Sequence, residues 1–255
     1  MSKMPALFVG HGSPMNAIED NSFTRCWVKL AEEIPRPKAI LAISAHWNGE
    51  GIRVNDEPFP KTIYDMYGFP EELYKINYNC PGSPELARSI KERLSKDVII
   101  DNSWGLDHGS WVVLKHMYPK CDIPVVQLSL DLSKDALTHF TLGKQLKALR
   151  DEGILILGSG NVVHNLSKVN FSMKGGYPWA ADFDKYIKDN IVNKNYDKVI
   201  NYKGAGDSAK LAFRTMEHFY PLLYILGATE EEDKVQVYND TCNLGSLSMT
   251  SYLFK

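Results

Sequence analysis

The chain has 255 residues and a net charge of -2, and 44% of its residues are hydrophobic and 24% charged, which is an ordinary globular composition. This balanced charge argues against a nucleic-acid partner, which needs a basic face. No apolar run approaches the roughly 20 residues of a membrane span, and the run PALFVG is too short for the core of a signal peptide. We therefore expect a cytoplasmic protein without a membrane partner, and the four widely spaced cysteines favour reduced thiols in that compartment.

Apolar runs alternate with amphipathic segments along the chain. In chain order, the patterns predict a strand at 5–10, a helix at 22–34, a strand at 38–44, a helix at 83–96, strands at 97–101 and 124–130, a helix at 133–153, a strand at 153–158, and late antiparallel strands at 234–240 and 247–254. Alternation of this kind is typical of an α/β fold, so we predict a single catalytic domain over residues 1–255 with a central, largely parallel mixed sheet flanked by helices. Residues 55–74 are irregular but rich in Pro, Tyr and Phe, so we expect them to pack over another part of the domain.

Histidines follow three of the predicted strands. His11 and His46 come just after the first two apolar runs, and His164 follows the run that ends near residue 158. Because ligands of open α/β sheets bind beyond the carboxyl ends of the strands, we expect these three side chains to share one site. His108 opens a predicted helix after a turn, and His218 begins an apolar helix, so both are further candidates.

A cluster of imidazoles with few carboxylates favours Zn, Fe, Cu or Ni over Mg or Ca. Histidines beyond the three that a metal needs suggest proton transfer next to it. The sequence has no GxSxG elbow, no HExxH pair and no complete GxGxxG, which argues against a serine hydrolase, a common zinc protease and a dinucleotide enzyme. The residues alone predict a mononuclear metalloenzyme, and they leave an iron oxygenase and a zinc hydrolase both open.

Five segments, spread in order over nearly the whole chain, resemble the class III extradiol ring-cleavage dioxygenases, in particular the single-chain DOPA 4,5-dioxygenase branch. These segments are ALFVGHGSPMNAIEDN, AISAHW, LDHGSWVVLKHMYP, ILGSGNVVHNL and EHFYPLLYILGA. The resemblance implies a non-haem Fe(II) enzyme that inserts O2 into a catechol-type, DOPA-like substrate and gives a ring-opened semialdehyde.

The same resemblance implies roles for individual residues. His11, His46 and His218 would be the metal ligands, His164 the acid/base residue and His108 a second histidine that contacts the substrate. In a related branch a glutamate is the third ligand, so Glu217 competes with His218. If the two residues lie on a helix they point about 100° apart, and one metal would take only one of them. We favour His218.

Two other functions compete with this interpretation. One is a zinc-dependent hydrolase that uses a His-bound hydroxide, since Zn can occupy the same kind of site. The other is a non-enzymatic, Memo-type binding protein on the same fold, although the presence of both His108 and His164 argues against it. The expected partners are a small catechol and O2, and the chain is expected to be a monomer or a small homo-oligomer.

Overall fold

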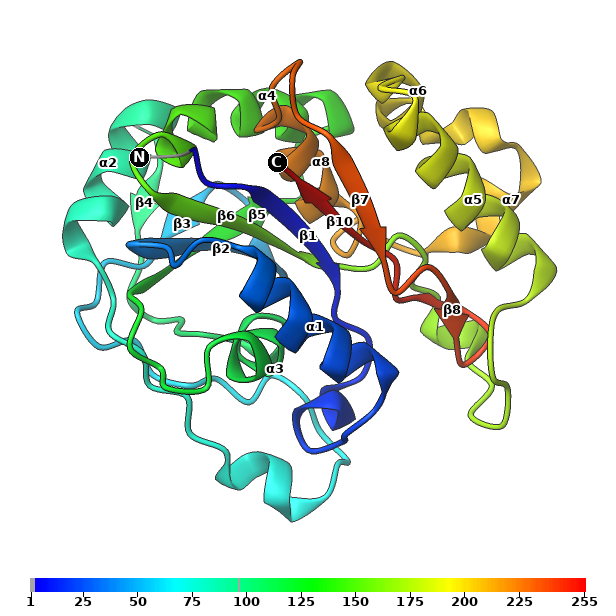
Figure 1. The fold of residues 1–255 in the computed structure, drawn as a ribbon, viewed down its shortest axis with the longest axis horizontal. Helices are drawn as coiled ribbons and strands as arrows, with labels where there is room; N and C mark the ends of the chain where they lie inside the picture. Colours follow the sequence, from blue (N-terminus) through cyan, green and yellow to red (C-terminus); the bar gives the residue numbers. More distant parts are fainter. Residues whose placement is uncertain (1–2, 96) are drawn as a thin grey trace.

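A computed structural model describes residues 3–95 and 97–255 (Figure 1). Within these residues, eight strands form one sheet: β1 (Ala6–Gly10), β2 (Ala39–Gly49), β3 (Arg53–Val54), β4 (Ile99–Ile100), β5 (Val125–Asp131), β6 (Ile154–Gly160), β7 (Val235–Tyr238) and β10 (Ser251–Phe254). Their order across the sheet is β4-β3-β5-β2-β6-β1-β10-β7. The central strands β5, β2, β6 and β1 are parallel, whereas β10 and β7 continue the sheet antiparallel next to β1. This confirms the predicted α/β fold with a largely parallel mixed sheet.

Both faces of the central sheet are buried, because helices cover each of them. The described helices are α1 (Ser22–Glu33), α2 (Pro84–Leu94), α3 (His108–Met117), α4 (Ala136–Leu146), α5 (Pro178–Val192), α6 (Tyr196–Ile200), α7 (Asp207–Ala212) and α8 (Tyr220–Gly227). Figure 1 shows α1 and α3 on one side of the sheet and α2, α4 and α8 on the other. Alternate residues of one strand enter the two layers: Leu7 and Val9 of β1 pack with the α1 and α3 side, whereas Ala6 and Phe8 pack with the α8 side. A strand buried on both faces reads as a continuous apolar run, which is why the central strands were visible in the sequence.

The predicted helices begin close to where their capping residues place them. Asn21 and Thr24 form a reciprocal capping box at the start of α1, and the Ser83 side chain accepts a hydrogen bond from the third residue of α2. The helix predicted at 133–153 is shorter than expected. It begins after Asp135, which caps it, and its last turns become a 3₁₀ helix at Lys147–Arg150.

The late part of the chain differs from the expectation in two ways. The predicted strand at 247–254 is two elements, because its first residues form a separate hairpin of β8 (Cys242–Asn243) and β9 (Leu247–Ser248), and only β10 joins the large sheet. Helices α5, α6 and α7, which the sequence patterns did not reveal, form a group at the side of the sheet near this hairpin (Figure 1). No helix in the described part of the chain combines the length and apolar character needed to span a membrane.

One histidine of the helical layer is buried away from the others. His139 in α4 is fully buried, and its ring stacks on Tyr220 of α8 with the ring centroids 4.0 Å apart. Within residues 3–95 and 97–255, neither ring nitrogen has a hydrogen-bond partner. Burial lowers the pKa of His139 to about 4, and the opposing effects of Asp131 and Asp135 are smaller.

Replacing His139 with leucine, which is similar in volume, should make the protein less sensitive to acid. An unfolded histidine titrates near 6.5, so between about pH 6.5 and 4 the unfolded chain binds a proton that the folded chain does not. The free energy of unfolding therefore falls as the pH falls, by up to about 1.4 kcal/mol per pH unit for this group. Urea unfolding at pH 7.5 and 5 should show a smaller loss of stability for His139→Leu than for the natural chain. An equal loss in both would show that His139 can be protonated while the protein stays folded.

Candidate metal centre

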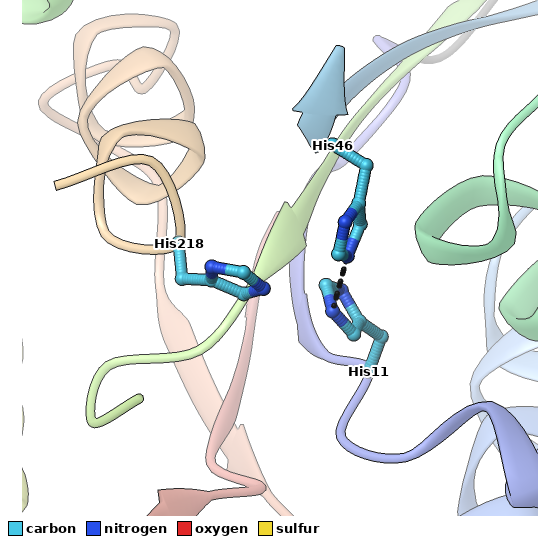
Figure 2. Close-up of side chains that lie close together, drawn as sticks. All are labelled: His11, His46 and His218. Atoms are coloured by element: carbon cyan, nitrogen blue, oxygen red, sulfur yellow. Dashed lines mark hydrogen bonds between the residues drawn. The ribbon is translucent and has the colours of Figure 1, made fainter. Parts of the chain in front are cut away.

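Three imidazoles converge near the carboxyl ends of β1 and β2. His11 directly follows β1, His46 lies near the end of β2, and His218 lies in a turn just before α8. One ring nitrogen from each lies within 4.8 Å of the other two, and the Nε2 atoms of His11 and His46 are 3.2 Å apart. Figure 2 shows the rings of His11 and His46 facing each other, with the ring of His218 directed at them from the other side. Residues separated by most of the chain thus share one small space.

An irregularity in β2 places His46. The apolar run ends at Ser44, but the strand continues to Gly49, and its pairing with β5 shifts register between Ile43 and Asn48. A bulge of this kind bends a strand and redirects the side chains next to it. The sequence placed His46 after the strand, whereas the structure places it within the strand, beside the bulge.

The turn that carries His218 packs closely against β6. The main-chain N–H of Asn161 donates to the carbonyl oxygen of His218 at 2.9 Å. A Cβ atom on Gly160 would lie only 2.1 Å from that oxygen. Glycine at position 160 therefore allows the main chain of His218 to approach the sheet.

The Nδ1 atom of His11 faces away from the shared space. It lies 2.9 Å from the hydroxyl oxygen of Ser159, and that hydroxyl donates its own proton to the carbonyl oxygen of Gly109. The Ser159 oxygen can therefore only accept from His11, so the proton of the His11 ring lies on Nδ1. The Nε2 atom is left with a lone pair that faces His46 and His218.

The outer nitrogen, Nδ1, of each of the other two rings contacts a carboxylate, as that of His11 contacts the Ser159 hydroxyl. Oδ2 of Asp65 lies 3.2 Å from Nδ1 of His46, and Oε1 of Glu217 lies 3.2 Å from Nδ1 of His218. The contact of His218 with Glu217 is a hydrogen bond, and that of His46 with Asp65 is within ion-pair distance. A carboxylate without a proton accepts and cannot donate, so both contacts favour a proton on Nδ1, which leaves Nε2 of each ring as a lone-pair donor. Hydrogen bonds from ligand imidazoles to carboxylates are a common second layer around protein-bound metals. Glu217 and His218 precede α8 in a turn, so their side chains are not held about 100° apart as on a helix, and the Glu217 carboxylate contacts the outer side of the His218 ring.

These three side chains fit a bound cation. With the protons on the outer nitrogens, the Nε2 atoms of His11 and His46 direct two lone pairs at each other, which is unfavourable unless a positive charge lies between them. Nε2 of His218 is buried and has no hydrogen-bond partner in the described part of the chain, although buried polar atoms are normally paired. Three imidazole nitrogens suit Fe(II) or Zn(II) better than Mg or Ca.

The rings are neutral near pH 7. Burial lowers the pKa of His11, His46 and His218 well below the usual value, and the neighbouring imidazoles lower each pKa further. A histidine must lose its proton before it can bind a metal, so the protein has already made these rings competent ligands.

His164 and His108 complete the group. The ring of His164 stacks flat on His218, with centroids 3.4 Å apart and an interplanar angle of 6°. Burial lowers the pKa of His164 to about 4. The ring of His108 lies 3.9 Å from that of His46, and its Nδ1 is 2.8 Å from Oδ2 of Asp65. The structure thus brings together all five histidines that the sequence analysis singled out as candidates.

Two residues of the site were missed in the sequence. Ser159 lies between two glycines at the end of the buried strand β6, and no sequence pattern distinguishes it there from a structural serine. Asp65 lies in the irregular stretch at 55–74, which was expected to pack over another part of the domain, but the sequence did not indicate which part. Neither position has a spacing pattern relative to the histidines that it contacts.

The fold and this cluster of histidines define the class of protein. The family model described as the catalytic LigB subunit of aromatic ring-opening dioxygenase matches residues 4–255, and the chain belongs to this family of ring-opening dioxygenases. Such enzymes depend on a metal, and the histidine cluster is a possible site for one.

Individual proteins similar to this chain carry more specific names than the family does. The chain is 47% identical to a protein of Escherichia coli (strain K12) named 4,5-DOPA dioxygenase extradiol, over 98% of this chain and 94% of that protein. It is 41% identical to a protein of the same name from Beta vulgaris, over 97% and 95% of the two chains. A crystal structure of an uncharacterised Escherichia coli K12 protein superposes with a TM-score of 0.86 at 44% identity, covering 99% of this chain and 100% of the other.

Proposed function

We propose that the protein is an extradiol dioxygenase that cleaves the ring of a DOPA-like catechol, with Fe(II) held by His11, His46 and His218. The observation that carries the proposal is the convergence of three unprotonated Nε2 atoms, one of them buried and unpartnered in the described structure. Membership of the ring-opening family favours this function over zinc-dependent hydrolysis and over a binding protein without activity. The names of the relatives support DOPA or a similar catechol as the substrate.

Three protein ligands leave positions open for a substrate and for O2. Bound Fe(II) would supply the electron transfer between the catechol ring and O2 that neither the substrate nor the side chains can perform alone. Zn(II) suits the same nitrogen ligands, but it has no redox chemistry. Glu217 and Asp65 would act from the outer side, by fixing the orientation of the rings that they contact.

The two remaining histidines would handle protons and the substrate. With its low pKa, His164 is unprotonated near neutral pH, so one of its ring nitrogens can accept a proton from a catechol hydroxyl and later return it. Its stacking on His218 keeps it next to the metal ligands without making it one. His108 would contact the substrate through Nε2, because Asp65 occupies its Nδ1.

We further infer that the chain acts as one catalytic domain, as a monomer or a small homo-oligomer. Its partners would be the catechol and O2, with no nucleic acid or membrane involved. The wide spacing of the four cysteines in the sequence, with no CxxC pair, supports a cytoplasmic location, where cysteines remain reduced.

Metal-free protein loaded anaerobically with Fe(II) should consume O2 when a catechol is added. The expected stoichiometry is one O2 per catechol, because both oxygen atoms enter the product. An oxygen electrode measures uptake, and a yellow absorbance reports the ring-opened semialdehyde. A screen of L-DOPA, protocatechuate and unsubstituted catechol should show the highest kcat/KM for L-DOPA.

Zn(II)-loaded protein is the matched control, since it has the same ligands but no redox activity. It should bind catechol and consume no O2. Ester hydrolysis by the zinc form, together with an inactive iron form, would instead support the zinc hydrolase. An iron form that consumes O2 but prefers another catechol would correct the substrate and leave the reaction standing.

A further inference from the structure

Asp65 connects the irregular stretch at 55–74 to the centre of the site. The segment is fixed to the chain just before α3, because the N–H of Ile63 donates to the carbonyl oxygen of Leu106 at 2.7 Å. The indole N–H of Trp111 in α3 donates to the carbonyl oxygen of Ile63 at 2.9 Å. The side chain of Asp65, only 8% exposed, extends from this anchored backbone to the histidines.

The carboxylate of Asp65 has three donors around it. Oδ1 accepts the main-chain N–H of His108 at 2.9 Å. Oδ2 lies 2.8 Å from Nδ1 of His108 and 3.2 Å from Nδ1 of His46. The polar groups within reach of this carboxylate are thus three nitrogens that can donate, so both of its oxygens are placed to accept. One carboxylate thus contacts two residues: His46, a proposed metal ligand, and His108, which is both the proposed substrate-contacting histidine and the first residue of α3.

We propose that Asp65 is a positioning residue that fixes the proton on Nδ1 of both His46 and His108, and so presents Nε2 of both rings to the site. The proposal rests on the proposed function for its consequence, since Nε2 of His46 is then free to bind the metal and Nε2 of His108 is left for the substrate. One oxygen atom, Oδ2 of Asp65, thus contacts both rings, of which His46 would bind the metal and His108 the substrate.

Asparagine cannot replace the carboxylate here. Every group that faces Asp65 is a donor: one main-chain N–H and two ring N–H groups. An amide has one acceptor and one NH2 donor, so whichever way it is turned, its NH2 meets another donor. The main-chain N–H cannot change its role, whereas an imidazole can move its proton from Nδ1 to Nε2. In Asp65→Asn the oxygen should therefore stay with the main chain of His108, and at least one ring should adopt the Nε2–H form.

The test is the position of the ring protons, read from long-range 1H–15N spectra of the histidine side chains in metal-free, 15N-labelled protein, because a bound metal would by itself fix the proton of His46 on Nδ1; metal affinity is measured separately by titration with Zn(II). The natural chain should show Nδ1–H on both His46 and His108. Asp65→Asn should show Nε2–H on one or both, and metal affinity should fall roughly 10- to 100-fold, the usual effect of losing an outer partner of a ligand. Asp65→Glu keeps an all-acceptor group and should keep Nδ1–H on both rings, with part of the affinity regained.

Asp56→Asn is the matched control, because Asp56 belongs to the same irregular stretch but bonds Asn102 instead of a histidine. It should leave both the ring protons and the metal affinity unchanged. The proposal is overturned if His46 or His108 carries Nε2–H in the natural chain, or if Asp65→Asn leaves both rings as they were. If Asp65→Asn fails to fold, the spectra of the natural chain and of Asp65→Glu still test the proposal, because each of these proteins must show Nδ1–H on both rings. Inactivity of the iron form would refute the proposed reaction without affecting this result.

Discussion

Replacing His218 with alanine should leave the protein unable to retain a metal, and ring cleavage should disappear with it. The variant loses one of three converging nitrogens, and the remaining pair, His11 and His46, cannot complete a stable centre. Metal content after loading with Fe(II) or Zn(II) and desalting measures the first effect, and O2 uptake measures the second. His11→Ala should behave in the same way.

Glu217→Gln is the control that separates the two candidates for the third ligand. Its carboxylate contacts Nδ1 of His218 from outside, so the amide variant should keep its metal, with affinity lowered roughly 10- to 100-fold. If Glu217→Gln loses the metal as completely as His11→Ala while His218→Ala retains it, then Glu217 is the ligand and the assignment of His218 is wrong.

Replacing His164 with alanine should leave the metal in place and lower turnover by roughly 10²- to 10⁴-fold, the usual contribution of a general acid or base. His164 stacks on the face of His218 and is not part of the proposed ligand trio of His11, His46 and His218, although its ring nitrogen also lies within 4.8 Å of ligand atoms of Glu217 and His218. Its removal therefore takes away a proton carrier but no ligand. Bound iron and kcat, measured on the same preparation, keep the two effects apart.

Two outcomes would contradict this role. Loss of iron equal to that of His11→Ala would make His164 a ligand, and His108 would be the next candidate for the acid/base. Full iron with nearly unchanged turnover would make the stacked ring a structural support for His218.

The fold could be predicted because its central strands are buried on both faces. Runs such as the one at 38–44 have apolar residues at successive positions, so they are easy to recognise as strands. Side chains that follow parallel strands gather at one edge of the sheet, so the shared position of the histidines could be predicted as well. Helices α5–α7 escaped prediction because they pack beside the sheet and do not alternate with its strands. The split of 247–254 into β9 and β10 depends on a hairpin partner, β8, whose two residues carry no pattern of their own.

The histidines that converge could be picked out in the sequence, but the residues that contact their outer nitrogens could not. Histidines that follow apolar runs are conspicuous, whereas Asp65 and Ser159 matter only through contacts made across the fold. Sequence spacing also does not decide between Glu217 and His218, because the two residues lie in a turn, where spacing does not set the direction of a side chain.

The three converging histidines leave the ribosome at very different times. His11 and His46 are made early, and about 170 residues separate His46 from His218, which is on the order of 10–30 s of synthesis at typical rates. Throughout this interval the nascent chain has two of the three imidazoles and lacks the turn that packs against Gly160. The complete centre can therefore form only after nearly the whole chain has been made. On the proposed ligand assignment, metal acquisition therefore belongs to the last stage of the protein's maturation.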